Sequence, residues 1–182
     1  VLIEDPTKDL EYVTPAIYAE QPKIDNTPAE QKEESDEQAI ERIRERFDIL
    51  DRMTHAVAEG TVRGMIVSGP PGVGKSFGVE TVLEDYDMLT EVAGKPRRTE
   101  VVKGSVTPIG LFQTLFNNSE KGNILVFDDC DSVLFDEVCL NMLKATLDSG
   151  KKRYITWKSE SNALRREGIP DRFEFKGGCI FI

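Results

Sequence analysis

The stretch Gly69-Pro70-Pro71-Gly72-Val73-Gly74-Lys75-Ser76 decides how this chain is expected to fold. It fits the pattern G-x-x-x-x-G-K-[ST], in which the backbone N–H groups of a glycine-rich loop surround the phosphates of a nucleotide. In that pattern the lysine, here Lys75, reaches the β/γ oxygens, and the hydroxyl of Ser76 holds Mg²⁺. The motif therefore predicts a nucleotide-binding loop that runs from Gly69 to Phe77 and takes ATP or GTP.

The segments on either side of this loop are those that a phosphate-binding loop needs. Residues 64–67 predict a short buried strand, and residues 77–89 predict a helix. The apolar side of that helix consists of Val79, Val82, Leu83 and Tyr86. A helix N-terminus carries partial positive charge, and glycines let the backbone approach the phosphates without a Cβ in the way. The alternative is a chance glycine-rich turn, which would not be expected between a strand and a helix.

Strands and helices alternate along the rest of the chain. Ser35 and Gln38 form a capping pattern at the start of a predicted helix. Apolar residues recur at helical spacing along it until Gly60, which ends the helix. The other predicted elements are strands at 99–103, 124–127 and 179–182, and helices at 108–116, after the capping Thr107, and at 136–147. Helices between strands imply right-handed crossovers, so the predicted fold class is α/β, with a parallel sheet between two layers of helices.

A buried strand followed by two acids is the second chemical feature. Residues 124–127 form an apolar run that is typical of a parallel strand buried on both faces, and Asp128 and Asp129 follow it directly. The C-terminal edge of such a sheet faces the ligand crevice. In nucleotide hydrolases the first acid helps to hold Mg²⁺ and the second polarises the attacking water. Asp128 is therefore the predicted metal residue beside Ser76, and Asp129 with Lys75 is predicted to be catalytic. The alternative is a pair of solvated strand-end aspartates.

Together these motifs resemble the core of the AAA+ ATPases. The likeness rests on residues 69–76, residues 124–129 and the apolar strand at 179–182, and it covers roughly residues 39–182. In detail the chain is similar to AAA-type ATPases of tailed bacteriophages. The resemblance implies a three-layer P-loop NTPase fold of the AAA+ and ASCE type, with ATP and Mg²⁺ as ligands. It also implies a homo-oligomeric ring when the protein is full length.

The chain departs from that family in two respects. The family's second acid is typically Glu, whereas Asp129 is one methylene shorter, so slow turnover or assistance from Asp131 is expected. The family's polar sensor residue directly follows the strand that matches residues 179–182, where this sequence ends. The resemblance therefore implies that the sensor, the arginine finger and the helical lid domain lie beyond residue 182, and that the chain is a fragment without its lid.

A basic segment precedes the last predicted strand. Residues 151–182 carry eight bases and four acids in an acidic protein, and strands are predicted at 153–157 and 172–175 around a polar loop. AAA+ cores can carry a β-hairpin at this point, and in helicase-like branches the hairpin touches DNA. The resemblance therefore favours nucleic acid or protein as the substrate of the ring.

Four residues of this segment are candidate nucleic-acid contacts. Lys158, Arg165 and Arg166 supply charge for phosphates, and Trp157 supplies a ring on which a base can stack. In the alternative interpretation the tryptophan fills a core and the bases form a solvated rim. A third possibility is that Arg165, Arg166 or Arg172 faces the nucleotide of a neighbouring subunit.

The negative charge of the chain lies mostly at its N-terminal side. The net charge is −10 over 182 residues, and residues 1–38 hold eleven acids, three bases and four prolines. This composition predicts a solvated or partner-docked extension over residues 1–38 and one ATPase core over residues 39–182.

Composition also excludes several classes of protein. No apolar run reaches the ~20 residues that span a bilayer, so we expect a cytoplasmic protein without a membrane partner, located in the host cytoplasm if a phage encodes it. Cys130, Cys139 and Cys179 lack a C-x-x-C pairing and are expected to be core thiols.

Three functions remain open at this point. The first is an oligomeric ATPase that acts on nucleic acid or protein. The second is a nucleotide-dependent binding module with little turnover, which the short Asp129 favours. The third is a small-molecule kinase, although no acceptor pocket or basic lid is recognisable in the sequence.

Overall fold

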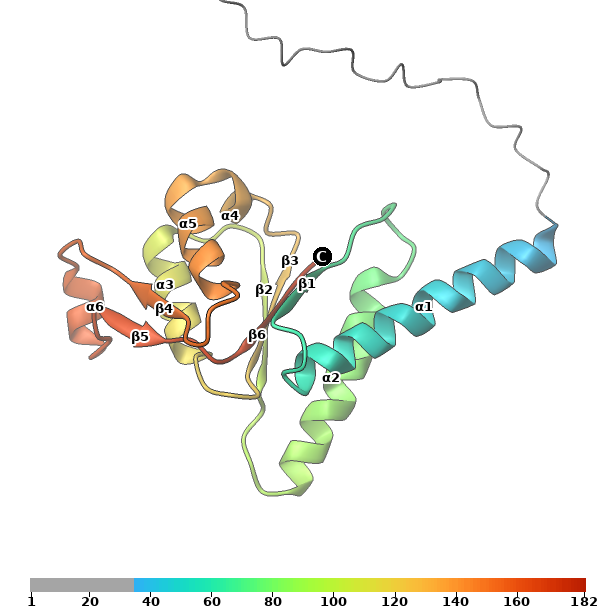
Figure 1. The fold of residues 1–182 in the computed structure, drawn as a ribbon, viewed down its shortest axis with the longest axis horizontal. Helices are drawn as coiled ribbons and strands as arrows, with labels where there is room; N and C mark the ends of the chain where they lie inside the picture. Colours follow the sequence, from blue (N-terminus) through green and yellow to red (C-terminus); the bar gives the residue numbers. More distant parts are fainter. Residues whose placement is uncertain (1–34) are drawn as a thin grey trace, which may run out of the picture. The chain divides into compact units, whose positions relative to one another are not determined.

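A four-stranded parallel sheet organises the part of the chain that the structure describes. The structure is a computed structural model that describes residues 35–182, so nearly all of the acidic extension lies outside the described residues. The strands are β1 (Gly64–Ile66), β2 (Thr99–Lys103), β3 (Ile124–Asp128) and β6 (Gly178–Phe181), in the spatial order β1-β6-β3-β2. All three pairings are parallel, so the strands end at one edge of the sheet (Figure 1).

Helices cover both faces of this sheet. The side chains of Ile124 and Val126 join a cluster with α1 (Asp36–Ala58) and α2 (Lys75–Val92). Leu125 and Phe127, which alternate with them, join a larger cluster with α3 (Pro108–Asn117) and α5 (Glu137–Thr146). Alternate residues of a strand point to opposite faces. The predicted α/β fold with a parallel sheet between helices is therefore confirmed (Figure 1).

Helix α1 buries only the C-terminal part of its predicted apolar face. Val57 is 2% exposed, whereas Ile40 and Ile43 are about half exposed. Val57 packs onto the first residue of β6, where a Cβ on Gly178 would lie 2.7 Å from the Val57 Cγ1. Glycine at this position therefore lets the helix approach the sheet. The first turns of α1 extend beyond the sheet, which is why their apolar residues stay exposed (Figure 1).

A two-stranded hairpin precedes β6, as predicted. Strands β4 (Tyr154–Thr156) and β5 (Arg172–Glu174) pair antiparallel, and the loop between them contains α6 (Asn162–Arg166). The guanidinium of Arg153 donates hydrogen bonds to the carbonyl oxygens of Thr146, at 2.8 Å, and Gly177, at 3.0 Å. These bonds connect the hairpin to the end of α5 and the start of β6.

The predicted helices agree with the observed ones apart from their ends, and two short helices were not predicted. Thr107 caps α3 by accepting a hydrogen bond from the Gly110 N–H, and the helix begins with Pro108 as predicted. Asp136 caps α5 in the same way and does not belong to the helix. The two unpredicted helices are the four-residue α4 (Ser132–Phe135) and the five-residue α6, which lies where a polar loop was predicted. No helix within residues 35–182 is long and apolar enough to cross a membrane.

Candidate functional site

The glycine-rich loop joins β1 to α2 and ends in a left-handed turn. Gly72 and Gly74 have φ angles of 77° and 92°, a region of backbone conformation that glycine adopts at no steric cost. Helix α2 begins at Lys75, directly after Gly74. The Lys75 ammonium donates hydrogen bonds to the carbonyl oxygens of Gly69, at 3.1 Å, and Pro70, at 3.0 Å. The loop thus folds around its own lysine and holds the positive charge at the helix N-terminus.

The end of strand β3 meets this loop. All five residues of β3 are buried, including Asp128, which is 4% exposed. The Ser76 hydroxyl lies 3.0 Å from Asp128 Oδ1 in a hydrogen bond between residues 52 positions apart in the sequence. The two residues predicted to hold a metal are therefore adjacent, although they come from different elements.

A cleft of about 500 Å³ opens where these elements meet. Its walls include Lys75, Ser76, Asp128 and Asp129, together with the end of β6. A volume of this size falls in the range of small-molecule sites, and the C-terminal edge of a parallel sheet is where such folds bind ligands.

Asp129 occupies an unusual backbone conformation at this cleft. Its φ of 54° is the only positive value found for a non-glycine residue in the described part of the chain. The left-handed region is disfavoured for most side chains, and aspartate is among the residues that tolerate it. The Asp129 side chain is exposed, and its N–H donates to the carbonyl oxygen of Ile182 at 3.4 Å. This turn directs the chain out of β3 while its carboxylate remains at the cleft.

Lys103 is a site residue that the sequence reasoning missed. Its ammonium lies 2.9 Å from Asp128 Oδ2 and 3.0 Å from the Glu80 carboxylate. Hydrogen bonding to Asp128, and then to Glu80, raises the pKa of Lys103 above its ordinary value. The signal was available: β2 and β3 were both predicted, each ends in a charged residue, and their register pairs Lys103 with Asp128.

A second hollow adjoins the loop on the side of α1. This groove, of about 730 Å³, is lined by Phe47, Leu50 and Met53 of α1 and by Pro70 and Val73 of the loop. Gly69 and Lys75 line both the groove and the cleft. The lining of the groove is mostly apolar. The predicted loop residue Phe77 points outward and is 76% exposed.

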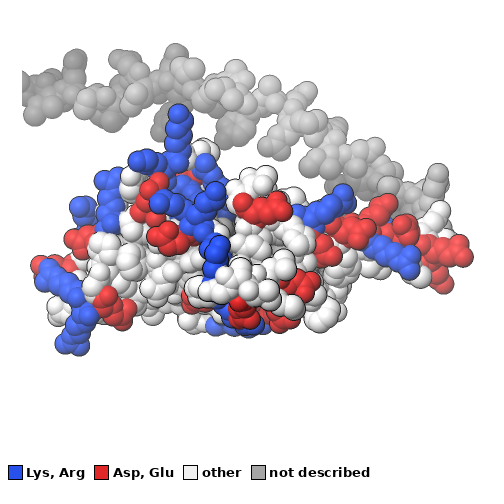
Figure 2. Space-filling view, turned by 90° about the horizontal axis from the view of Figure 1, so that it is seen from below, with Lys and Arg blue, Asp and Glu red and all other residues white. Residues whose placement is uncertain are grey.

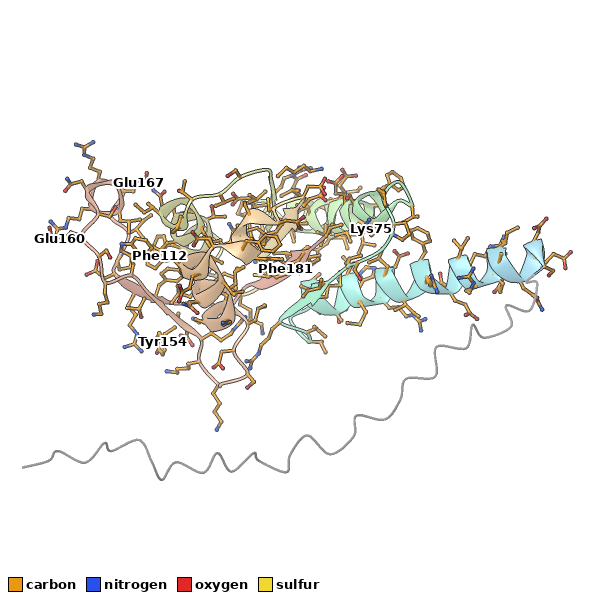
Figure 3. The ribbon with its side chains drawn as sticks, turned by 90° about the horizontal axis from the view of Figure 1, so that it is seen from above. Lys75, Phe112, Tyr154, Glu160, Glu167 and Phe181 are labelled. Carbon is orange, nitrogen blue, oxygen red and sulfur yellow. The ribbon has the colours of Figure 1, made fainter. Side chains whose placement is uncertain are left out.

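The candidate nucleic-acid residues belong to the hairpin region, which lies far from Lys75 (Figure 3). Figure 3 shows Lys75 well separated from Tyr154, Glu160 and Glu167 of the hairpin region. Lys158, Arg165 and Arg166 are exposed there. Within one chain, the structure therefore does not bring these bases to the cleft.

The aromatic and basic residues of the hairpin also have structural roles. The Trp157 ring lies 5.8 Å from the ring of Phe112 and packs against the larger core cluster, which favours the core alternative for this residue. The Arg172 guanidinium covers the Tyr154 ring at 4.0 Å. Figure 2 shows Lys and Arg side chains over the left half of one face, with acidic side chains among them.

Comparison with known proteins gives one informative similarity for this α/β, parallel-sheet chain. The chain is 34% identical over 166 residues to an uncharacterized 36.7 kDa protein from the nrdC–mobD intergenic region of Enterobacteria phage T4. The match covers 91% of this chain and 49% of the phage protein, so the chain spans about half the length of that relative. No protein-family model matches the chain, and no solved structure does. The similarity associates the chain with bacteriophage proteins.

Proposed function

We propose that this chain is a Mg²⁺-dependent, ATP-binding and ATP-hydrolysing module of the P-loop NTPase class and of the AAA+ type. The observation that carries the proposal is the 3.0 Å contact between Ser76 of the loop and Asp128 at the end of β3. A glycine-rich turn without a nucleotide function would not require an acid from a strand 52 positions later. The strand order adds support. Strand β6, on which the resemblance also rests, lies between the strand that precedes the loop and the strand that ends in Asp128, so the segments that carry the resemblance are neighbours in one sheet.

The residues at this contact fit a magnesium ion. Mg²⁺ prefers hard oxygen ligands and usually keeps several waters, so a hydroxyl and a carboxylate beside a phosphate site suit it. Ser76 and Asp128 would hold the ion, directly or through its waters. When bound, the ion neutralises charge on the phosphate oxygens.

The other site residues have separate tasks in the proposed reaction. Lys75 is expected to exchange its carbonyl contacts for phosphate oxygens, because a charge-assisted bond to phosphate is stronger than one to a neutral carbonyl. Asp129, whose carboxylate is exposed at the cleft, is expected to orient and polarise the attacking water. Its buried neighbour Asp128 is not available for that task, because it is expected to hold the metal together with Ser76.

The groove beside α1 supports a nucleotide over a smaller phosphate ligand. It begins at the loop residues Gly69 and Lys75 and continues over apolar side chains such as Phe47 and Leu50. A nucleoside attached to phosphates held by the loop would find an apolar surface for its base there. The preference for ATP over GTP rests on the resemblance alone.

The partners of the proposed module follow from the resemblance and from the hairpin. We propose a homo-oligomeric ring for the full-length protein that remodels nucleic acid or protein, with the hairpin of β4 and β5 as the substrate-facing part. The similarity to a phage T4 protein supports a phage origin, and so the host cytoplasm as the place of action.

A nucleotide-dependent binding module with little turnover is the second candidate. Asp129 favours it, because this short side chain stands where the resembling ATPases have Glu and its backbone is held in the left-handed conformation. Such a module would use the same loop and the same metal residues.

Two measurements on the purified protein test these proposals. Calorimetric titration with ATP and Mg²⁺ tests binding, and phosphate release under the same conditions tests hydrolysis. Binding with release supports the ATPase, and binding with negligible release supports the binding module. Failure to bind any nucleotide would refute both. Transfer of phosphate to an added metabolite, rather than to water, would instead identify a small-molecule kinase.

A further inference from the structure

We propose that Lys103 is a positioning residue that holds Asp128 in the metal-free protein and releases it to Mg²⁺ when nucleotide binds. The released ammonium then pairs with Glu80 alone. This inference rests on the proposed function, because Mg²⁺ is expected at Asp128 only if the cleft binds a nucleotide.

The two oxygens of Asp128 have different partners. Oδ1 faces the Ser76 hydroxyl at 3.0 Å, and Oδ2 faces the Lys103 ammonium at 2.9 Å. The Asp128 side chain is only 5% exposed. A buried carboxylate without a compensating partner is costly, so a cation must accompany Asp128 in either state. Lys103 supplies that cation when no metal is present.

Lys103 is the exposed member of this pair. Its side chain is 59% exposed, against 5% for Asp128, so the ammonium can move into solvent while the carboxylate stays in place. The second acceptor is already in contact, because Glu80 Oε1 of α2 lies 3.0 Å from the same ammonium. A small movement of the lysine therefore frees Asp128 without leaving Lys103 unpaired.

Lys103 and Mg²⁺ compete for the same carboxylate. A metal ion bound at Asp128 would lie close to the ammonium, and like charges at short distance repel each other. We therefore expect the ammonium to increase the Mg²⁺ concentration that nucleotide binding requires. A neutral side chain of similar length at residue 103 should reduce it.

The test is the Mg²⁺ dependence of ADP binding, measured by calorimetry over a series of free Mg²⁺ concentrations. For Lys103→Met the midpoint concentration is expected to fall by about 3- to 10-fold. Lys95→Met, which removes an exposed lysine before the other end of β2, is the matched control and should leave the midpoint unchanged. Without Mg²⁺, Lys103→Met should also unfold at a lower temperature than the wild type, and it should gain more from Mg·ADP.

Glu80 allows a second, independent test of the inference. Glu80→Gln removes the alternative acceptor, so the midpoint should rise, and this rise should be much smaller when Lys103→Met is also present. An unchanged or higher midpoint in Lys103→Met would overturn the inference, as would an equal effect of Glu80→Gln in both backgrounds. If the wild type shows no Mg²⁺-dependent ADP binding at all, the proposed function itself fails, and the inference fails with it.

Discussion

Leu50 on α1 lies directly over Gly78 on α2. A Cβ at Gly78 would approach the Leu50 Cδ2 to 3.2 Å, and it would also lie 3.7 Å from Phe47. Both α1 side chains line the apolar groove beside the loop, so the contact fixes the distance between the two helices and the width of that groove.

Replacement of Gly78 by valine should therefore push α1 away from α2. We expect a loss of about 1–3 kcal/mol in the free energy of unfolding, as for other overpacked sites, together with weaker nucleotide binding. Urea unfolding and calorimetry measure the two effects. Glu84→Val, at an exposed position of α2, reports the cost of a valine in this helix away from α1. Equal losses in both variants would show that the close contact is unimportant.

Lys75→Ala should weaken nucleotide binding by at least tenfold, or ~1.4 kcal/mol, because it removes a charged contact to the phosphates. The fold should remain intact, since the lysine contacts only carbonyl oxygens of its own loop. Calorimetry with Mg·ADP measures the affinity, and Lys121→Ala serves as a control for the loss of one exposed positive charge. Wild-type affinity in Lys75→Ala would refute the assignment of the loop.

Asn substitutions at the two strand-end acids should have different consequences. Asp128→Asn is expected to reduce both the Mg²⁺ dependence and the rate of phosphate release, because Asp128 is the buried partner of Ser76. Asp129→Asn should leave binding intact and abolish release, because its exposed carboxylate is expected to act on water. Asparagine also tolerates the left-handed backbone at residue 129, so the change should not disturb the fold. Two variants that both bind and hydrolyse normally would place the active site elsewhere.

Two buried cysteines, Cys139 and Cys179, should make the protein less stable at high pH. Burial, and then hydrogen bonding to Asp136, raises the pKa of the Cys139 thiol to about 11, and burial raises that of Cys179 to about 12, from an ordinary value of 9.0. The unfolded chain releases these protons near pH 9, while the folded protein retains them. The free energy of unfolding therefore falls as the pH rises above 9, whereas below that pH the thiols cause no such loss.

Denaturant unfolding at pH 7, 8, 9 and 10 measures this dependence. The variant Cys139→Ala, Cys179→Ala should show a shallower decrease between pH 9 and 10 than the wild type. At pH 8 in native buffer, Cys139 should react with a thiol reagent about 100-fold more slowly than in denaturant. Rapid labelling of the native protein would contradict the buried positions of the cysteines.

Nucleic-acid binding by the hairpin region can be tested through its salt dependence. Each phosphate contact contributes about 0.7 to the log–log salt slope for a single strand, so loss of three contacts should flatten it by about two. The variant with Lys158, Arg165 and Arg166 all replaced by Ala should show this change in fluorescence anisotropy with a labelled single strand. The control variant, with Lys95, Arg97 and Lys121 replaced by Ala, loses the same charge from the loops before β2 and β3. Equal slopes in the two variants would favour a solvated rim.

Most elements of the fold could be predicted because their sequence signals are local. Strand β2 has the predicted bounds, and α3 begins as predicted because Thr107 and Pro108 determine its first turn. The short helices α4 and α6 were missed because four or five residues carry no helical period. The exposed start of α1 was missed because an apolar stripe predicts a buried face but does not say where the neighbouring sheet ends.

The residues of the cleft could be predicted where a motif names them, and not where only pairing brings them together. Ser76 and Asp128 were expected to meet, and the structure brings them to 3.0 Å. Lys103 belongs to no motif, and its place beside Asp128 depends on the register of two strands. The groove was also missed, because an apolar helix face does not reveal that part of it, with Phe47 and Leu50, lines a groove beside the loop.

Strand β6 occupies the middle of the sheet although it is the last described strand in the sequence. It pairs with both β1 and β3, and no pairing joins those two strands directly in the part of the chain that the structure describes. The loop that follows β1 and the acids at the end of β3 therefore reach their final distance only after β6 has inserted between the strands. Such non-local pairing is slow, because the connecting chain must be ordered first. We expect the cleft to form late in folding, so a nascent chain would have its helices and the β2–β3 pair before it could use Lys75 and Asp128 together.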